Sequence, residues 1–156
     1  MEKKFELTDN FIINAFGVKL LQSKCTKSFK YAKEGDLGGY VEKDENLDQE
    51  SDAWVSGNAR VSGNARVYGD AEVYGNAEID NNNKHCGFDC FGSANRHTHA
   101  YLTKENKVEI TCGCFRGSIE EFEKRVEETH SGTIYEKQYK AIIDVIKIKF
   151  GLTDLI

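Results

Sequence analysis

Apolar and polar residues recur with a fixed period of six through the centre of the chain. Residues 53–82 read AWVSGN, ARVSGN, ARVYGD, AEVYGN and AEIDNN, so every hexad begins with alanine and has valine or isoleucine at its third place. A turn-forming pair, mostly Gly-Asn or Gly-Asp, closes the units. This period predicts short parallel strands stacked around one core. The predicted core residues are Val55, Val61, Val67, Val73 and Ile79, with Ala53, Ala59, Ala65, Ala71 and Ala77 at the tight corners.

These hexads resemble the hexapeptide repeats of the left-handed parallel β-helix family, in which three hexads make one triangular coil. The resemblance implies a short left-handed parallel β-helix of two to three coils over residues 41–82, with Val41 and Leu47 extending the register in the alanine phase. Such a short stack leaves both ends uncovered, so capping segments or self-association must protect it. Because the related proteins usually form trimers, the resemblance also implies a homotrimer.

The best-known members of that family are acyltransferases, which generally use a histidine as base. All four histidines of this chain, His85, His97, His99 and His130, lie after the last hexad. A hexapeptide-repeat acyltransferase is therefore the least favoured of the functions considered, and the repeats are interpreted as a scaffold.

Residues 1–40 are predicted to form an N-terminal β cap. KFEL and GVKLLQSK have the pattern of two short strands, and the glycine-rich GDLGG at 35–39 stands where the chain enters the repeats. A glycine-rich loop also suggests phosphate binding, but the GxxxxGK[ST] spacing and its lysine are missing. A tight entry turn is the favoured interpretation.

Residues 83–156 are predicted to form a small α+β domain, a β-hairpin followed by two helices. Residues 97–103 and 107–114 flank the turn-prone KEN and have the pattern of the hairpin. Ser118 and Glu121 match a capping box, which places a helix start directly after Gly117. Another apolar stripe follows HSGT and predicts the second helix. The expected fold class is thus a mixed β-solenoid plus α+β protein.

Three blocks follow one another along the chain: GDLGG at 35–39, the hexads, and CGCFRG at 112–117 followed by EEF. Together they resemble a group of phage and prophage proteins with this recurrent architecture, and the resemblance covers nearly the whole chain. It implies a phage setting and supplies no catalytic residues. Cys86 and Cys90, in HCGFDCFG, depart from the pattern of the group.

The corner between the predicted hairpin and helix is the candidate ligand site. CGCFRGS places glycines, an aromatic ring, Arg116 and a capped helix start within a few residues, and the N–H groups of a helix start attract anions. Guanidinium groups for phosphate, a ring for stacking on a base and small polar groups for ribose suit a nucleotide. The predicted ligand-binding residues are Asn95, Arg96, Thr98, Tyr101, Phe115, Arg116, Gly117 and Ser118. The alternative is a structural corner with Phe115 in the core and Arg96 paired with a glutamate.

The cysteines allow two other interpretations. Cys86, Cys90, Cys112 and Cys114 offer four thiols in two pairs for a structural zinc ion, although their spacing differs from the usual Cys-x2-Cys knuckle. A cysteine nucleophile at Cys112 or Cys114 with a histidine base is the other, and nothing in the sequence fixes that geometry. We therefore name no cofactor and no catalytic residue, and we lean against an enzyme.

Charge and hydropathy narrow the possible partners. The formal net charge is −5 with 30% charged residues, and no cluster of Lys and Arg is present, which argues against broad nucleic-acid binding. No apolar run has the length of a membrane span, and the start MEKKFELTDNF lacks the apolar core of a signal peptide. The chain is therefore expected to be cytoplasmic, in the host cell if a phage encodes it.

The function expected from these observations is a phage-like, non-enzymatic protein that binds a small anionic ligand, with a nucleotide as the first choice. In the phage setting, sequestering a nucleotide signal of host immunity would make it an anti-defence protein. The alternative is a structural or protein-interaction module that binds a host or virion protein. For that alternative, Tyr68 and Tyr74, with Trp54 nearby, provide an aromatic stripe on the repeats.

Overall fold

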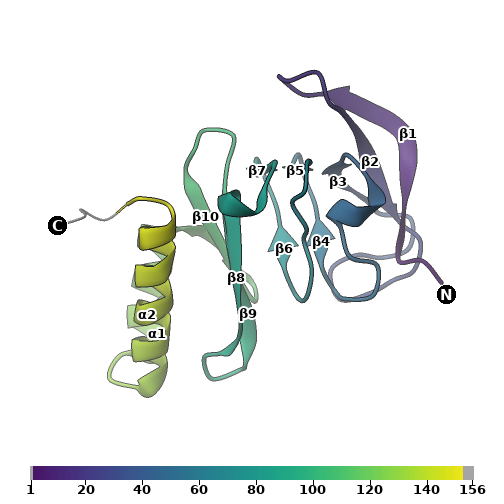
Figure 1. The fold of residues 1–156 in the computed structure, drawn as a ribbon. Helices are drawn as coiled ribbons and strands as arrows, with labels where there is room; N and C mark the ends of the chain where they lie inside the picture. The colour runs from purple at the N-terminus through teal and green to yellow at the C-terminus, as the bar shows by residue number, and fades with distance from the viewer. Residues whose placement is uncertain (1, 153–156) are drawn as a thin grey trace.

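The N-terminal strands begin a large mixed sheet at one end of the molecule. The computed structural model describes residues 2–152 and contains three sheets and two α-helices. Strands β1 (Phe5–Ile13), β2 (Lys19–Cys25) and β3 (Leu37–Val41) pair antiparallel in chain order. The two strands predicted from KFEL and GVKLLQSK are therefore confirmed. Figure 1 shows them at the opposite end of the molecule from the helices, with the hexads between.

The hexads form four strands of two residues each, β4 (Trp54–Val55), β5 (Arg60–Val61), β6 (Glu72–Val73) and β7 (Glu78–Ile79). Their pairing is parallel and joins positions three hexads apart, so that Trp54 lies opposite Glu72 and Arg60 opposite Glu78. The ten valine, isoleucine and alanine positions predicted as core are confirmed, because none exposes more than 1% of its surface. Glycines in the four turns have φ between 62° and 70°, a region that residues with a Cβ rarely adopt.

The fold class expected from the sequence, a mixed β-solenoid plus α+β protein built on a left-handed parallel β-helix, is wrong. The strands of the hexads belong to two different sheets. Strands β4 and β6 form a two-stranded sheet, whereas β5 and β7 extend the N-terminal strands into a five-stranded sheet of order β1-β2-β3-β5-β7. The prediction failed because a sequence period shows which positions are buried and where the chain turns, but not which strands share hydrogen bonds.

The register expected for the residues before the hexads is also wrong. Val41 pairs with Val61, and Leu47 forms an isolated parallel bridge with Val67, so both residues stand at valine positions and not at alanine positions. Trp54, expected on an outer aromatic stripe, is buried, with its ring edge-on to Phe29 at 5.3 Å between centroids. The segments on both sides of β3 therefore pack directly against the hexads and do not only cover their end.

The C-terminal part is a four-stranded antiparallel sheet with two helices packed on it (Figure 1). Its strands are β8 (His85–Phe91), β9 (Arg96–Leu102), β10 (Val108–Cys112) and β11 (Phe115–Ser118), in the order β11-β10-β9-β8. The predicted hairpin is confirmed as β9 and β10, but β8 and β11 add two strands that the sequence did not predict.

Two helices follow the sheet, α1 (Ile119–His130) and α2 (Ile134–Lys149). The predicted capping box is confirmed: the Ser118 hydroxyl accepts from the Glu121 N–H at 3.1 Å, and the Glu121 carboxylate accepts from the Ser118 N–H at 3.1 Å. The apolar faces of both helices pack on Ile110 and its neighbours in the sheet. No helix within residues 2–152 combines the length and apolar character of a membrane span.

The C-terminal sheet is fastened directly to the last hexads. Tyr101 of β9 is fully buried within the core of the hexads. The Thr111 hydroxyl donates to the Glu72 carbonyl at 2.8 Å, and Arg116 forms an ion pair with the Glu72 side chain. These contacts fix the position of β9, β10 and β11, and so of the candidate site that they carry, relative to the repeats.

Candidate functional site

A pocket of about 160 Å³ lies between the sheet and both helices. Its lining includes three rings of the core: those of Phe115 and Phe122 lie 5.1 Å apart, and Tyr139 stands edge-on to Phe122 at 5.5 Å. The guanidinium groups of Arg96, on β9, and Arg125, on α1, complete the lining. The pocket thus combines aromatic rings with two cations, each carried by a separate element.

The two cations of this pocket are not neutralised by nearby acids. Within the described residues neither Arg96 nor Arg125 has a carboxylate at salt-bridge distance, whereas Arg116 pairs with Glu72. Arg125 instead lies over the Phe115 ring at 5.5 Å, and Arg96 rests against Gly113, where a Cβ atom would collide with its guanidinium. Exposed arginines held in this way retain their hydrogen-bond donors for an anion.

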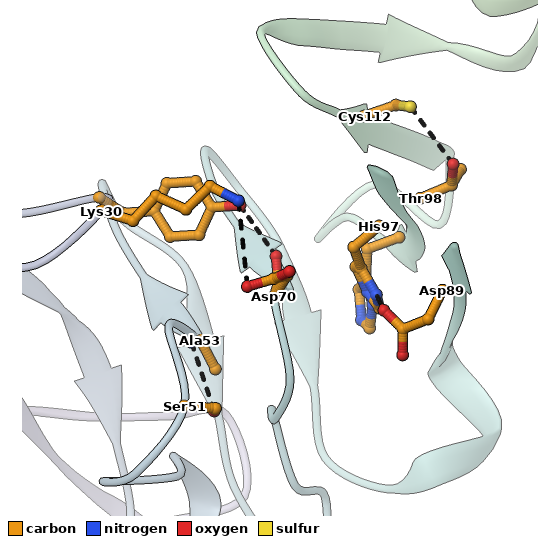
Figure 2. Close-up of polar contacts among 10 residues, drawn as sticks. Lys30, Ser51, Ala53, Asp70, Asp89, His97, Thr98 and Cys112 are labelled. Atoms are coloured by element: carbon orange, nitrogen blue, oxygen red, sulfur yellow. Dashed lines mark hydrogen bonds and ion pairs between the residues drawn. The ribbon is translucent and has the colours of Figure 1, made fainter. Parts of the chain in front are cut away.

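A second pocket, of about 310 Å³, adjoins the first and shares Arg96 and Cys114 with it. Lys30, Tyr31 and His97 are among its other lining residues. Lys30 lies over the Tyr31 ring and 3.9 Å from the Asp70 carboxylate, a contact visible in Figure 2. We call the two pockets together the Arg96 site.

The predicted ligand-binding residues are only partly gathered at this site. Arg96 and Phe115 both line the first pocket, but Phe115 is also a buried member of the core, as the structural alternative expected. Arg116, in contrast, points to the hexads, where its guanidinium pairs with Glu72 and lies 3.9 Å from the centre of the Tyr74 ring. The reason is strand alternation, because adjacent residues 115 and 116 of β11 face opposite sides of the sheet.

The other predicted residues have structural partners. Tyr101 is buried, and its hydroxyl accepts from the Tyr74 N–H at 3.3 Å. Thr98, also buried, donates to the Cys112 thiol at 3.3 Å (Figure 2).

The last three lie at turns or strand ends. Asn95 is exposed in the turn before β9, with φ of 51°. Gly117 pairs with Ile110 in the sheet, and Ser118 caps α1. None of the three lines either pocket of the Arg96 site.

Among the lining residues of the first pocket that the sequence did not assign to the site are Arg125, His130 and Tyr139. The His130 ring stacks on Tyr139 at 5.5 Å, and burial raises the pKa of the Tyr139 hydroxyl above its ordinary value. A signal for Arg125 was present, because it follows Phe122 by three residues and therefore lies near the apolar face of α1. Because that face was interpreted only as core, Arg125 at its edge was not assigned to the site.

A chain of hydrogen-bonded histidines runs beside the second pocket. The Asp89 carboxylate contacts Nδ1 of His97, as Figure 2 shows, and Nε2 of His97 lies 2.9 Å from Nδ1 of His99. Nε2 of His99 lies 2.9 Å from Nδ1 of His85, and Nε2 of His85 lies 3.0 Å from the Asn82 side-chain oxygen. Three imidazole rings are thus linked end to end between two oxygen acceptors.

The orientation of Asn82 is fixed by its other partners. Its Oδ1 accepts from the Arg66 N–H at 3.2 Å, and its Nδ2 donates to the Asn64 carbonyl at 3.3 Å. The atom facing His85 is therefore an acceptor, and the histidine ring must donate to it.

The hydrogen bonds along this chain need one proton more than three neutral imidazole rings carry. Four hydrogen bonds need four protons, but three neutral imidazoles have only three N–H groups. One proton must therefore be added to the set formed by the rings and Asp89. Placing it on His97 makes that ring a donor to both Asp89 and His99, with the carboxylate as its counter-charge.

Burial agrees with this assignment. Desolvation lowers the pKa of His85 to about 4 and, with the neighbouring His85 and His97 rings, lowers the pKa of the fully buried His99 well below its ordinary value. Both rings are therefore neutral near pH 7, which leaves the extra proton to the contact between His97 and Asp89. The sequence signal was the alternation of His97 and His99, which places both on one face of a strand.

The cysteines considered for zinc are spread over different environments. Cys112 is buried in the core of the C-terminal part and Cys86 packs against that core, whereas Cys90 and Cys114 are exposed. Among residues 2–152, no three His, Cys, Asp or Glu side chains are grouped as ligands of a metal ion. The four thiols therefore do not form one ligand set in the described part of the chain.

Comparison with known proteins adds no relative from which a site could be transferred. No protein-family model matches the sequence, and no curated protein matches it significantly. The geometry of the Arg96 site is therefore the basis on which we infer function.

Proposed function

We propose that the protein binds a small anionic ligand with a flat ring, most simply a nucleotide, at the Arg96 site. The observation that carries this proposal is the pair of arginines, Arg96 and Arg125, without carboxylate partners among the described residues and placed around Phe115. Guanidinium groups bind phosphate through paired hydrogen bonds, and aromatic rings stack on bases. A site that required only structural arginines would normally pair them with acids.

The size of the site supports a ligand that extends over both pockets. A volume of about 160 Å³ is below the 300 Å³ or so that encloses a drug-sized molecule, but the second pocket adds about 310 Å³ on the other side of Arg96. A nucleotide placed with its phosphate at Arg96 would direct its base toward the aromatic wall.

Binding without turnover is the form of function that we propose. A histidine base needs a free ring nitrogen, and His97 in the second pocket offers none, because both its nitrogens are engaged by Asp89 and His99. His130 lines the first pocket with Cys114, so the fate of the bound ligand is the measurement that tests turnover there. In the phage setting implied by the sequence resemblance, and in the cytoplasm of the host, such a protein would act by sequestering a nucleotide signal of immunity. The homotrimer implied by the sequence resemblance stays untested, and the assembly that we argue for below is a dimer.

Replacing Arg96 or Arg125 by alanine is expected to weaken nucleotide binding by about 10- to 100-fold each, since a hydrogen bond to a charged group contributes about 1.5–3 kcal/mol. Isothermal titration with AMP, ATP, cyclic AMP and a cyclic dinucleotide would measure the dissociation constants. Arg66→Ala is the matched control, because Arg66 is an exposed arginine paired with Asp48, outside the site.

The fate of the ligand decides between binding and catalysis. A bound nucleotide recovered unchanged after heat denaturation supports sequestration, whereas a chemically altered product would establish an enzyme. If none of the nucleotides raises the melting temperature of the protein, the proposed ligand class is wrong.

A protein-interaction module is the second candidate, and one observation favours it. The β1–β2 hairpin carries exposed apolar side chains, with 52% of Phe11, 54% of Ile13 and 80% of Phe16 accessible. Exposed apolar clusters often mark protein contacts. Phe16→Ser should then abolish co-purification of a specific host or virion protein while leaving nucleotide binding unchanged.

A further inference from the structure

Helix α2 carries two apolar faces, and only one of them packs against the rest of the chain. Tyr139, Ile142, Ile143 and Ile146 form the buried face. The second face consists of five exposed residues, Ile134, Ala141, Val145, Ile148 and Leu152, the last lying just beyond the helix. Between 49% and 64% of each of its four large side chains is accessible. We call this set the outer stripe.

The spacing of the outer stripe matches what a second helix requires. The four members within the helix are separated by seven, four and three residues, which are the intervals of the a and d positions of a heptad. Leu152 follows Gly151, whose φ of 70° ends the helical path, so it adjoins the stripe without continuing its spacing. Gln138 stands at the place between Ile134 and Ala141, but its side-chain oxygen accepts from the Gly92 N–H at 2.9 Å, so the side chain is held toward the sheet and is not part of the stripe. Because this spacing of 3.5 residues keeps side chains on one line along a helix, the stripe fits a helical partner better than a strand or a flat surface.

We propose that the outer stripe binds the outer stripe of a second copy of the chain, with the two α2 helices antiparallel. The charges along one edge of the stripe support this choice of partner. Lys137 and Asp144 both lie on that edge and have opposite signs. In an antiparallel pair the same edges meet, so that Lys137 of each copy faces Asp144 of the other across the layer that contains Ala141.

This register also accounts for the small residue in the stripe. Ala141 lies near the two-fold axis, where the backbones approach most closely, and Ile134 then packs on Val145 of the second copy. Ile148 lies beyond the first turn of the partner's α2 in this register, so the contact is centred on Ile134, Ala141 and Val145. The contact is isologous, so it closes after two copies. It is independent of the Arg96 site, since none of the stripe residues lines either pocket of that site.

The area available predicts a dimer that depends on concentration. A helix of 16 residues is about 24 Å long, and one such contact is smaller than the roughly 800 Å² per partner of a standard stable interface. We therefore expect a reversible monomer–dimer equilibrium, with association that strengthens at low salt because the Lys137–Asp144 pairs lie at its edge.

Sedimentation equilibrium of the full chain over a range of concentrations tests the proposal. Val145→Asp should shift the dissociation constant of the dimer upward by at least about 100-fold, since an unpaired charge would be buried in the contact. Lys137→Asp should weaken the dimer by about 10-fold, because like charges would then face each other. Adding Asp144→Lys to that variant should restore the dimer. Circular dichroism would confirm that each variant is folded. Lys124→Asp on the exposed side of α1 is the matched control and should leave the equilibrium unchanged.

Three results would overturn the proposal. One is a chain that stays monomeric at every concentration, which would assign the stripe to a different protein. Another is an oligomer that Val145→Asp does not weaken, and the third is a double charge exchange that fails to restore the loss caused by Lys137→Asp. None of these results depends on nucleotide binding, which is measured separately with the Arg96 variants.

Discussion

The free energy of unfolding is expected to fall by about 3 kcal/mol as the pH is lowered from 6.5 to about 4, because of His85 alone. Burial depresses the pKa of His85 in the folded chain, so between these two values the unfolded chain binds more protons than the folded one. Stability is therefore complete above 6.5 and decreases as the pH falls toward 4. Burial also depresses the pKa of His99, so His99 too lowers the free energy of unfolding as the pH falls.

Denaturant unfolding at a series of pH values measures this effect. Glu109 acts in the opposite direction, since burial raises its pKa, so the informative quantity is the difference between the parent protein and His85→Gln. That variant should flatten the acid limb of the profile. His130→Gln is the matched control, because His130 stacks on Tyr139 and has no part in the histidine chain. An acid limb that His85→Gln leaves unchanged would contradict the assignment.

The same histidine chain makes a spectroscopic prediction. At neutral pH the nitrogen chemical shifts should show His97 protonated at both ring nitrogens, and His85 and His99 protonated only at Nε2, because these are the donors that four hydrogen bonds require. Asp89→Asn removes the carboxylate that contacts Nδ1 of His97 and should change this pattern of nitrogen shifts. A neutral His97 ring in the parent protein at neutral pH would show that the proton count is wrong.

Local features were predicted well because they depend on residues close in sequence. The capping box of Ser118 and Glu121 satisfies the N–H groups of one helix turn, so it specifies the start of α1 without reference to other elements. The buried valines of the hexads follow equally directly from their period. Both signals combine side-chain type with a short, fixed spacing.

Long-range pairing could not be obtained in the same way. The hexads are compatible with several arrangements of strands, and it is the parallel pairing of β3 with β5 that joins β5 and β7 to the N-terminal sheet. Similarly, the Arg96 site depends on Arg125, which meets Phe115 only because α1 folds back over the sheet. Arg116 was assigned to the site from sequence proximity, but alternation along β11 turns it toward Glu72.

Gly38→Ala is expected to destabilise the protein by about 3 kcal/mol, which makes it one of the most damaging single-methyl additions in the chain. GDLGG was predicted to be an entry turn, but Gly38 and Gly39 lie within β3, where the strand passes close to the hexads. A Cβ atom on Gly38 would lie 2.7 Å from both the Val55 carbonyl oxygen and the Trp54 ring, and would also collide with the Ser23 hydroxyl. The Val55 carbonyl and the buried Trp54 ring cannot both move aside without a large cost in free energy.

Leu37→Ala is the matched control for this prediction, because Leu37 is the neighbouring residue of the same motif and 56% of its side chain is accessible. It should change the free energy of unfolding by no more than about 0.5 kcal/mol. Gly38→Ala should lower the midpoint of urea unfolding without changing its slope, since the native fold is strained and the unfolded chain is hardly altered. An unchanged midpoint would mean that β3 can move away from Val55, and the glycines would then have to be explained by a ligand and not by packing.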